Sequence, residues 1–503
     1  MATKKVNHKP LWKRVDFYFV LVYAILTVAL IAQLFMVAIV PTKYAIPATI
    51  VLLLLLVGMY FLQMGKKVNK VNKILGKVLI VILSIALALG NLALFKFNST
   101  LSKIVGDNTE VSVVSVVVLD KSEYKELNDI KDKKLGKITI GDTEAIEKAY
   151  KEVKTDIGED ITTVEYKSYK DYGDDLYNGK VDAILVNEGS RGLFEDNHDS
   201  FSSDTRVIKQ YTYKTKSNDI SKSVKVTEEP FNVYITGIDT YGTISTVSRS
   251  DVNMIATVNP KTHQILLTSI PRDYYIPQTC QDNQTDKLTH TGIFGVQCTI
   301  DSVDNYFGLT MNYYARVNFS SVVEIVNALG GVTVDNPVAF NASDGTFSYP
   351  AGSVDMNGEM ALRFARERYN LSDGDRDRGK NQMRVITAII NKATSPSIIM
   401  NFSSILSAVG NTFQTNMSNS EISSLVKMQI NDMKGWDVKQ IAVSGVGNGS
   451  AWSPANGFNS WVMEPDKATV DGAVSLINKV QNGELVTDAD VQHQAELDAN
   501  VGN

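Results

Sequence analysis

Arginine is unevenly distributed in this chain of 503 residues, and its clustering is the first sign of chemistry. Of the 12 arginines, nine lie between Arg249 and Arg384, and five of these lie between Arg363 and Arg378. Guanidinium groups stay charged in apolar surroundings, and their paired donors match the geometry of phosphate oxygens. For an isolated cluster, surface ion pairs with neighbouring acids would be the favoured explanation. The cluster indicates a phosphate site only where further motifs converge with it.

The stretch ALRFARER could form either a strand or a helix, and the two alternatives place different arginines on one face. On a strand, Arg366 and Arg368 would share one face, whereas on a helix Arg363 and Arg366 would share it. Two other arginine motifs precede this stretch: SRSD contains Arg249, and SIPRDYY places Arg272 just after an expected strand over residues 264–269. A further base, Lys287, is expected in the loop DKLTHTGIFG.

Two carboxylates accompany these bases. Asp239 follows an expected strand over residues 231–238, and Asp251 opens another expected over residues 251–258. Carboxylates at the mouths of adjacent strands can hold Mg²⁺, which typically takes one or two of them together with substrate phosphates. The alternative is that both residues only cap turns.

The charge distribution separates a membrane part from an acidic outer part. Residues 1–97 carry 12 Lys and Arg and one acid, which leaves 38 bases and 54 acids for residues 98–503. Three apolar runs lie in the basic part: residues 17–40, 44–64 and 78–95. Each approaches the roughly 20 residues that a membrane-spanning helix needs. Nucleic-acid binding is disfavoured, because the large outer part is acidic.

The flanking bases predict the orientation of these spans. Five precede the first run and five lie between the second and third, but only Lys43 lies between the first and second. By the positive-inside rule, the N-terminus and the loop of residues 65–77 are cytoplasmic, so residues 98–503 are expected to be extracellular. Cys280 and Cys298 both lie in the outer part, where a disulfide is plausible. Two unrelated thiols are the alternative.

Strands and helices alternate in the outer part, which predicts an α/β fold with two domains. Residues 98–225 are expected to form a small accessory domain with a mostly parallel sheet, and its LYNGKVDAILVNEG stretch weakly resembles one lobe of extracellular solute-binding proteins. Residues 230–482 are expected to form a larger domain, beginning after a polar linker. Residues 251–258 and 264–269 flank the turn NPKT and predict a hairpin. Residues 445–449 are expected to be a flexible glycine-rich loop, and residues 483–503 a disordered tail.

Four motifs in order resemble those of the LytR–CpsA–Psr family: TGID with SRSD, then SIPRDYY, ALRFARER and DGDRDRGKNQ. The resemblance covers residues 231–393, and together with the three spans it is strongest to capsule-locus members. It implies a mixed central sheet with a hydrophobic tunnel for a lipid tail. It also implies transfer of a capsular polysaccharide from its polyprenyl-pyrophosphate carrier to peptidoglycan. The membrane and capsule assembly proteins would be further partners.

The resemblance also implies roles for individual residues. Asp239 and Asp251 would bind Mg²⁺ or Mn²⁺, and Arg249, Asp251 and Asp375 would form the catalytic group. The lipid pyrophosphate would be bound by a set of basic and amide side chains: Arg249, Arg272, Lys287, Arg366, Arg368, Arg378 and Gln382. Family members often have Arg-Gln where this chain has Asn381 and Gln382, and Gly-Gly where Gly292 and Gly295 are apart.

Two other functions fit the same residues. A membrane-anchored scaffold would bind the lipid-linked polymer without chemistry and regulate capsule assembly. A pyrophosphatase would use water, in place of a sugar hydroxyl, as the acceptor. Arginines and a metal ion suffice for either phosphoryl reaction, since positioning and charge neutralisation dominate its catalysis.

Overall fold

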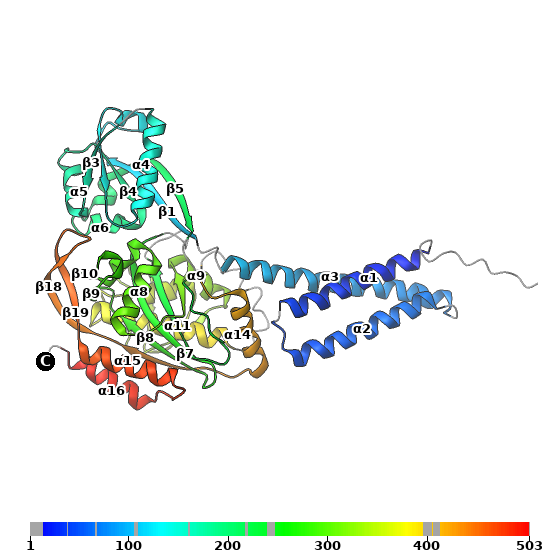
Figure 1. Cartoon of the computed structure of the whole chain (residues 1–503). Coiled ribbons are helices and arrows are strands. Elements are labelled where there is room, and N and C mark those ends of the chain that lie inside the picture. The colour runs from blue at the N-terminus through cyan, green and yellow to red at the C-terminus, as the bar shows by residue number, and fades with distance from the viewer. Residues whose placement is uncertain are drawn as a thin grey trace, which may run out of the picture. The chain divides into compact units, whose positions relative to one another are not determined.

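Figure 1 shows the computed structural model of the chain. It divides into two compact units. The first comprises residues 1–103, 395–407 and 418–434, and the second comprises residues 104–394, 408–417 and 435–503. The residues that the structure describes are 14–37, 39–65, 68–104, 109–158, 161–216, 220–238, 247–395, 405 and 413–501.

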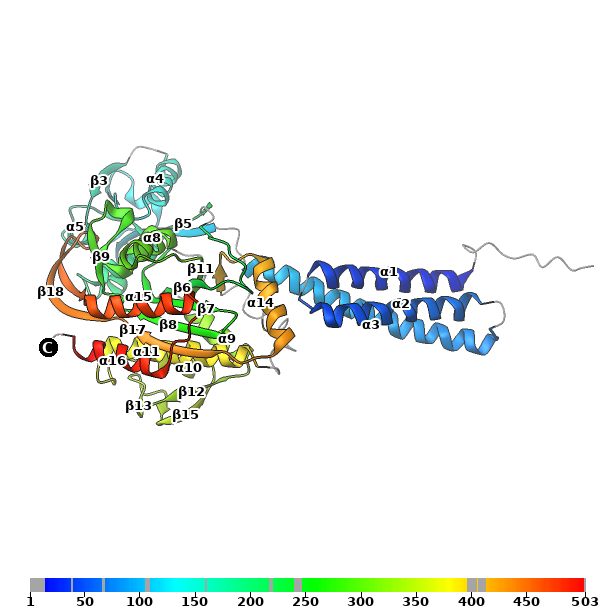
Figure 2. The same ribbon diagram turned by 60° about the horizontal axis from the view of Figure 1, so that its bottom comes forward.

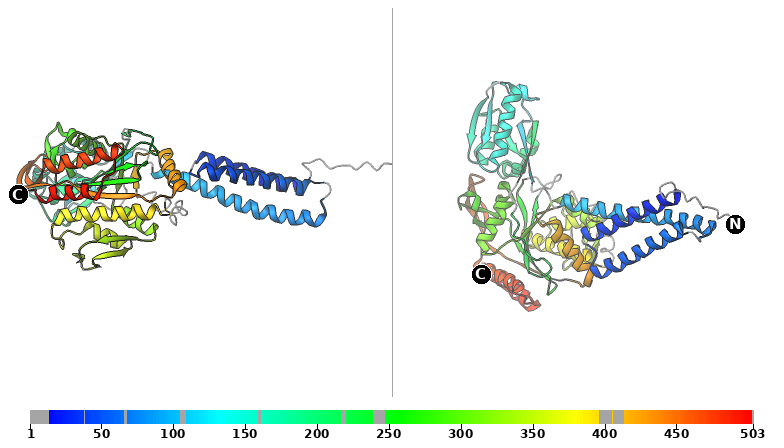
Figure 3. Two further views of the ribbon diagram at one scale, coloured as in Figure 1. Left: turned by 90° about the horizontal axis from the view of Figure 1, so that it is seen from below. Right: turned by 45° about the vertical axis from the view of Figure 1, so that its right-hand side comes forward.

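Three apolar helices dominate the first unit (Figure 3): α1 (Val15–Met36), α2 (Thr42–Met64) and α3 (Lys70–Ile104). Each contains a segment long and apolar enough to cross a membrane. They pack through an apolar cluster that includes Val20, Met59 and Ile80. Helix α3 continues to Ile104, beyond residue 97, the predicted limit of the membrane part. No glycine or proline interrupts the helix between Gly90 and Ile104. A fourth helix, α14 (Asn419–Asp432), also belongs to this unit.

The accessory domain lies in the second unit and contains a five-stranded sheet of order β3-β2-β4-β1-β5. Its elements are β1 (Thr109–Leu119), η2 (Leu127–Ile130), β2 (Lys134–Ile138), α4 (Thr143–Ile157), β3 (Thr162–Tyr166), α5 (Tyr169–Tyr177), β4 (Ala183–Asn187), η3 (Glu188–Ser190), α6 (Arg191–Glu195), α7 (Phe201–Asp204) and β5 (Thr205–Lys216). The prediction of a mostly parallel sheet is wrong, because β1 runs antiparallel to both of its neighbours. An apolar strand pattern carries no information on the direction of pairing.

The larger domain is built on a six-stranded mixed sheet of order β16-β11-β6-β7-β8-β17. Its strands are β6 (Phe231–Ile238), β7 (Ser250–Asn259), β8 (Gln264–Ile270), β11 (Tyr313–Val317), β16 (Phe413–Thr415) and β17 (Asp437–Ala442). The hairpin of β7 and β8 is confirmed, with Asn259 paired to Gln264 across its turn. Strand β6 pairs antiparallel with β7 and parallel with β11, so the sheet is mixed as expected.

Helices cover both faces of this sheet. On one face, α8 (Val296–Phe307) and α15 (Lys467–Gln481) pack on Tyr234, Ile255 and Leu266. On the other face, α11 (Gly374–Ala393) packs on Met254 and Leu267 through Met383. Figure 2 shows α15 and α11 on opposite sides of β8 and β17. The remaining elements that bear on the site are η5 (Leu288–Phe294), α9 (Phe319–Ala328) and α10 (Gly358–Arg366).

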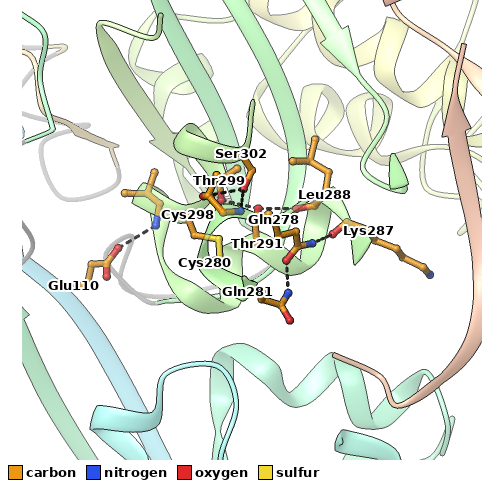
Figure 4. Close-up of a disulfide and its surroundings, with 12 residues drawn as sticks. Glu110, Gln278, Cys280, Gln281, Lys287, Leu288, Thr291, Cys298, Thr299 and Ser302 are labelled. Carbon is orange, nitrogen blue, oxygen red and sulfur yellow. Dashed lines mark hydrogen bonds between the residues drawn. A yellow bond between two sulfur atoms is a disulfide. The ribbon is translucent and has the colours of Figure 1, made fainter. Parts of the chain in front are cut away.

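Smaller elements complete the domain around this layer. They are β9 (Tyr275–Pro277), η4 (Thr279–Gln281), β10 (Thr285–Lys287), β12 (Val332–Asn336), β13 (Phe340–Asn341), β14 (Ser348–Tyr349), β15 (Gly352–Met356), β18 (Gly445–Ser453), β19 (Phe458–Pro465) and α16 (Asp488–Ala499). Cys280 and Cys298 form a disulfide, with their Cα atoms 5.5 Å apart (Figure 4). Beside it, the Gln278 side chain donates to the Lys287 carbonyl over 2.7 Å, which fixes the loop before η5.

Two predictions for the C-terminal part are wrong. The glycine-rich stretch is not a loop, because Gly445 to Asn448 pair with β19. The tail beyond residue 482 is not disordered, because α16 begins at a capping box of Thr487 and Asp490. The Gln494 amide of α16 is buried and donates to the carbonyls of Ala442 and Thr469. Polar contacts of this kind hold a helix without the apolar stripe that a sequence pattern would reveal.

Candidate functional site

A cavity of about 640 Å³ opens between the main sheet and helices α9, α10 and α11. Its inner lining is apolar and comes from four parts of the fold: Ile235, Ile238 and Val252 from β6 and β7, Ala315 and Val317 from β11, Val322 and Ile325 from α9, and Val385, Ile386 and Ile389 from α11. The charged part of its lining comprises six arginines and four acids: Arg249, Arg272, Arg363, Arg366, Arg368 and Arg378, with Asp196, Asp251, Asp344 and Glu367. Bases outnumber acids, so the charged end of the cavity is basic on balance.

Helix α11 contributes to both kinds of lining. Arg378, Gln382, Val385, Ile386 and Ile389 all line the cavity, and their spacing of four, three, one and three residues keeps them on one helix face. The basic end of this face lies in the first turns of the helix, and the apolar end lies toward its C-terminus. One helix thus connects the charged residues to the apolar wall.

Four residues form what we call the charge layer: Asp251, Arg272, Asp375 and Arg378. The Asp251 Oδ1 atom accepts from Arg272 Nη1 over 2.9 Å and from the Thr289 hydroxyl over 3.1 Å. Arg272 Nε lies 3.7 Å from Asp375 Oδ1, which in turn lies 2.6 Å from Arg378 Nη2. Acids and bases alternate through the layer, so each charge is compensated by a neighbour.

The electrostatics of the layer keep Asp251 ionised. Burial raises the pKa of this carboxyl, but the guanidinium groups of Arg249, Arg272 and Arg378 outweigh burial and hold its pKa below the ordinary value. Burial lowers the pKa of Arg272, but Asp251, Asp273 and Asp375 outweigh it and raise that pKa. The Oδ2 atom of Asp251 is buried and has no hydrogen-bond partner among the described residues. This oxygen is available as a ligand.

A second, small cavity of about 40 Å³ lies against the same residues. Asp251, Arg272, Arg378 and Gln382 line both cavities, whereas Asp375, Arg376 and Asp498 line only the small one among the described residues. The small cavity is large enough for a water molecule or two. The two cavities therefore share a wall made of charged and amide side chains.

The predicted arginines come together as expected, with differences in detail. The helical alternative holds for ALRFARER, because α10 ends at Arg366, and Arg368 lies beyond it. The Arg366 guanidinium lies 3.9 Å from the centre of the Phe319 ring, and the Arg368 guanidinium donates to the Tyr369 hydroxyl over 2.6 Å. Ion pairing with neighbouring acids, the competing interpretation, also holds in part, since Arg376 pairs with Asp373 at 3.3 Å and Arg378 pairs with Asp375 at 2.6 Å.

One predicted site residue stands apart from this group, and another is not among the described residues. Lys287 does not line either cavity in the part of the chain that the structure describes; its Nζ atom lies 3.6 Å from Asp273 Oδ1. Asp273 also lies 3.6 Å from Arg272 Nε, so Lys287 is linked to the charge layer through one carboxylate. Asp239, the other predicted metal ligand, lies outside the described residues.

Sequence reasoning missed three residues of the site. Thr289 and Asp273 lie inside quoted motifs, so their proximity to the arginines was a usable signal. Asp196, which follows α6 of the accessory domain, lines the large cavity and lies 3.6 Å from Arg249 Nη1. No local pattern connects Asp196 with an arginine 53 positions later in the chain.

Comparisons with known proteins agree with the motifs. The LytR_cpsA_psr family model matches residues 195–471. The polyisoprenyl-teichoic acid–peptidoglycan teichoic acid transferase TagU of Enterococcus faecalis is 37% identical over 211 residues, covering 41% of this chain and 68% of that protein. TagU of Bacillus subtilis is 35% identical over 206 residues, covering 41% and 65%. The crystal structure of B. subtilis TagU aligns with a TM-score of 0.40 at 29% identity, covering 52% of this chain and 100% of that one.

The family model spans more than half of the chain and includes all four arginine and aspartate motifs. The matches to the two TagU proteins extend over about two thirds of each relative. The chain belongs to the LytR–CpsA–Psr family.

Proposed function

We propose that this protein transfers a glycopolymer from a polyprenyl-pyrophosphate carrier to peptidoglycan outside the cell membrane. The observation that carries the proposal is one cavity with a basic end and an apolar lining. A polyprenyl pyrophosphate has the same two parts, an anionic head and a long apolar tail. The names of the relatives, which are teichoic acid–peptidoglycan transferases, support the same class of reaction.

The anionic head would lie at the basic end of the cavity. Arg249, Arg272, Arg366, Arg368 and Arg378 line this region, and a pyrophosphate carries enough oxygens to accept from several guanidinium groups at once. The Gln382 amide, one turn beyond Arg378, would add a neutral hydrogen bond. The tail would follow the apolar face of α11 toward Ile389.

A divalent cation fits the residues present, because the buried Asp251 Oδ2 atom has no hydrogen-bond partner among the described residues. We propose that Asp251 binds Mg²⁺ or Mn²⁺, with Asp239 as a second ligand and pyrophosphate oxygens completing the shell. When bound, the ion would neutralise charge that develops on the phosphate oxygens. Proteins usually bind Mg²⁺ through only one or two carboxylates, together with substrate phosphates. Asp251 supplies one such carboxylate among the described residues.

The transfer is a displacement at the phosphorus atom next to the polymer. A hydroxyl oxygen of peptidoglycan forms the new P–O bond, the bond to polyprenyl phosphate breaks, and the hydroxyl proton is released. The arginines stabilise the leaving phosphate and the charge on the equatorial oxygens. Asp375 lines the small cavity and is held by Arg272 and Arg378. Because both of these ion pairs fix its carboxylate in place, Asp375 is suited to orienting the acceptor hydroxyl.

The location of the reaction follows from the membrane part. Three apolar helices suggest membrane anchoring. With the bases of residues 65–77 on the cytoplasmic side, we propose a multi-pass protein whose residues 98–503 are extracellular. We propose a capsular polysaccharide as the polymer, and capsule assembly proteins as partners.

The experiment is a transfer assay with full-length protein in detergent, a labelled oligosaccharide on polyprenyl pyrophosphate, peptidoglycan fragments and Mg²⁺. We expect labelled peptidoglycan from wild type and from Lys261→Ala, which removes an exposed base in the β7–β8 turn. Arg366→Ala should lose at least about 100-fold in rate. Release of polyprenyl phosphate without labelled peptidoglycan would indicate a pyrophosphatase. Tight binding of the donor with neither product would indicate a scaffold.

A further inference from the structure

The accessory domain makes close contacts with the segment that contains Arg249. The Val247 amide donates to the Val111 carbonyl of β1 over 3.1 Å. Gly189 lies so close to the Val247 carbonyl that a methyl group there would overlap it. Gly292 of η5 is also close to this segment, because a methyl group there would overlap the Ser248 carbonyl oxygen. The backbone before β7 is therefore held between the two domains.

Further contacts join the accessory domain to the larger domain near this segment. Ile293 of η5 and Ala455, which follows β18, are both buried in the apolar core of the accessory domain. Glu110 of β1, labelled in Figure 4, accepts from the Val296 amide over 3.2 Å and pairs with the buried Arg316 at 3.5 Å. The accessory domain is thus attached to the larger domain by apolar, backbone and ionic contacts near the cavity.

The Arg249 guanidinium itself is in contact with the accessory domain. Its Nη1 atom lies 3.6 Å from Asp196 Oδ1 and donates to the Gly192 carbonyl over 3.5 Å. A methyl group on Gly192 would lie 2.7 Å from Nη2, so the absence of a side chain at this position makes room for the guanidinium. The Arg249 and Asp196 side chains are 20% and 32% exposed, and both line the large cavity.

We propose that Asp196 is a positioning residue for Arg249, so that the accessory domain completes the anion-binding end of the cavity. The inference rests on the proposed function, because it assigns Arg249 to a bound pyrophosphate. The carboxylate and the Gly192 carbonyl engage one nitrogen of the guanidinium. An arginine has five N–H donors, so the others remain available to phosphate oxygens. Fixing this long side chain before binding lowers the entropy that binding must remove.

The test measures the Kd of geranylgeranyl pyrophosphate with Mg²⁺ by calorimetry on the full-length protein in detergent. Asp196→Ala should weaken binding about fivefold, and Asp196→Asn, which keeps a hydrogen-bond acceptor, should recover part of that loss. On an Arg249→Ala background, Asp196→Ala should change the Kd less than twofold. Asp199→Ala, three residues away and exposed, is the control and should bind like wild type.

A second variant perturbs the Arg249 guanidinium sterically and leaves Asp196 in place. Gly192→Ala should displace Arg249 and weaken binding only when Arg249 is present, whereas Gly435→Ala, which has open space, should have no effect. Equal losses from Asp196→Ala with and without Arg249, no loss, or tighter binding would each overturn the inference. Absence of binding by wild type would overturn it together with the proposed function. If wild type binds the ligand and Arg366→Ala loses binding, the proposed function is retained whether or not the inference on Asp196 holds.

Discussion

Ile389 lies 11 residues beyond Arg378 on the cavity face of α11, and this spacing predicts how long a lipid tail the cavity holds. At about 1.5 Å per residue, the two side chains are roughly 16 Å apart along the helix. An extended isoprene unit of four carbon–carbon bonds is about 5 Å long by ordinary covalent geometry. The cavity face therefore accommodates about three isoprene units from the basic end.

The affinity of soluble prenyl pyrophosphates should follow this length. Burying one CH₂ group contributes about 0.8 kcal/mol, so a five-carbon unit contributes at most about 4 kcal/mol before the entropy of ordering is subtracted. We expect farnesyl pyrophosphate, with three units, to bind at least about tenfold more tightly than geranyl pyrophosphate, with two, which corresponds to about 1.4 kcal/mol. A fourth unit should add little.

The substitution Ile389→Trp tests where the tail ends. The larger side chain fills the far end of the cavity, so farnesyl pyrophosphate should lose about tenfold in affinity, while geranyl pyrophosphate should change less than twofold. Val338→Trp, at an exposed aliphatic residue, is the matched control. The measurement is isothermal calorimetry on the full-length protein. Affinity that does not depend on chain length, or an equal loss for both ligands, would refute the reasoning.

Three further perturbations follow from the contacts described above. Asp251→Asn should abolish the increase in prenyl pyrophosphate affinity that Mg²⁺ titration produces in wild type; an equal increase in both proteins would contradict the metal assignment. Lys479 and Thr487 lower the pKa of Asp490 to about 2, so its stabilising contribution is present above the ordinary value of 3.8 and is lost as pH falls toward 2. Hydrogen exchange of the α16 amides should accelerate over that range in wild type, but far less in Asp490→Asn. Replacing both Cys280 and Cys298 by Ser opens a link across 18 residues and should lower the free energy of unfolding by about 3 kcal/mol, measured by denaturant titration; wild type under reducing agent should match the double variant.

Local sequence patterns predicted the central part of the site well. Asp251 lies at the start of β7, and Arg272 lies just beyond the end of β8. Because β7 and β8 are neighbours in the sheet, the two side chains come together. The hairpin of β7 and β8 places them within hydrogen-bonding distance, as two expected strands on either side of the turn NPKT imply. Arg378 and Gln382 share a helix face because α11 begins at Gly374 and continues through both residues, which the motif DGDRDRGKNQ did not indicate.

Contacts between distant polar residues could not be predicted in this way. Asp196 pairs with Arg249, and Asp498 pairs with Arg376, although nothing in the sequence around either acid distinguishes it from a solvated one. The helix α16 has the same character, because the Gln494 amide and the carboxylates of Asp490 and Asp498 hold it, with Val491 as a partly buried core contact. Such pairs depend on the three-dimensional arrangement of whole domains, which a local pattern does not encode.

The wall shared by the large and small cavities has a consequence for the kinetics of the proposed reaction. Asp251, Arg272, Arg378 and Gln382 line both cavities, so a donor in the large cavity leaves the small cavity open to the reacting hydroxyl group of an acceptor, although not to a whole sugar. Both substrates can then be present together, and no residue needs to carry the polymer between two half-reactions. Steady-state rates should therefore show intersecting double-reciprocal lines, typical of a ternary complex, and not the parallel lines of a ping-pong enzyme.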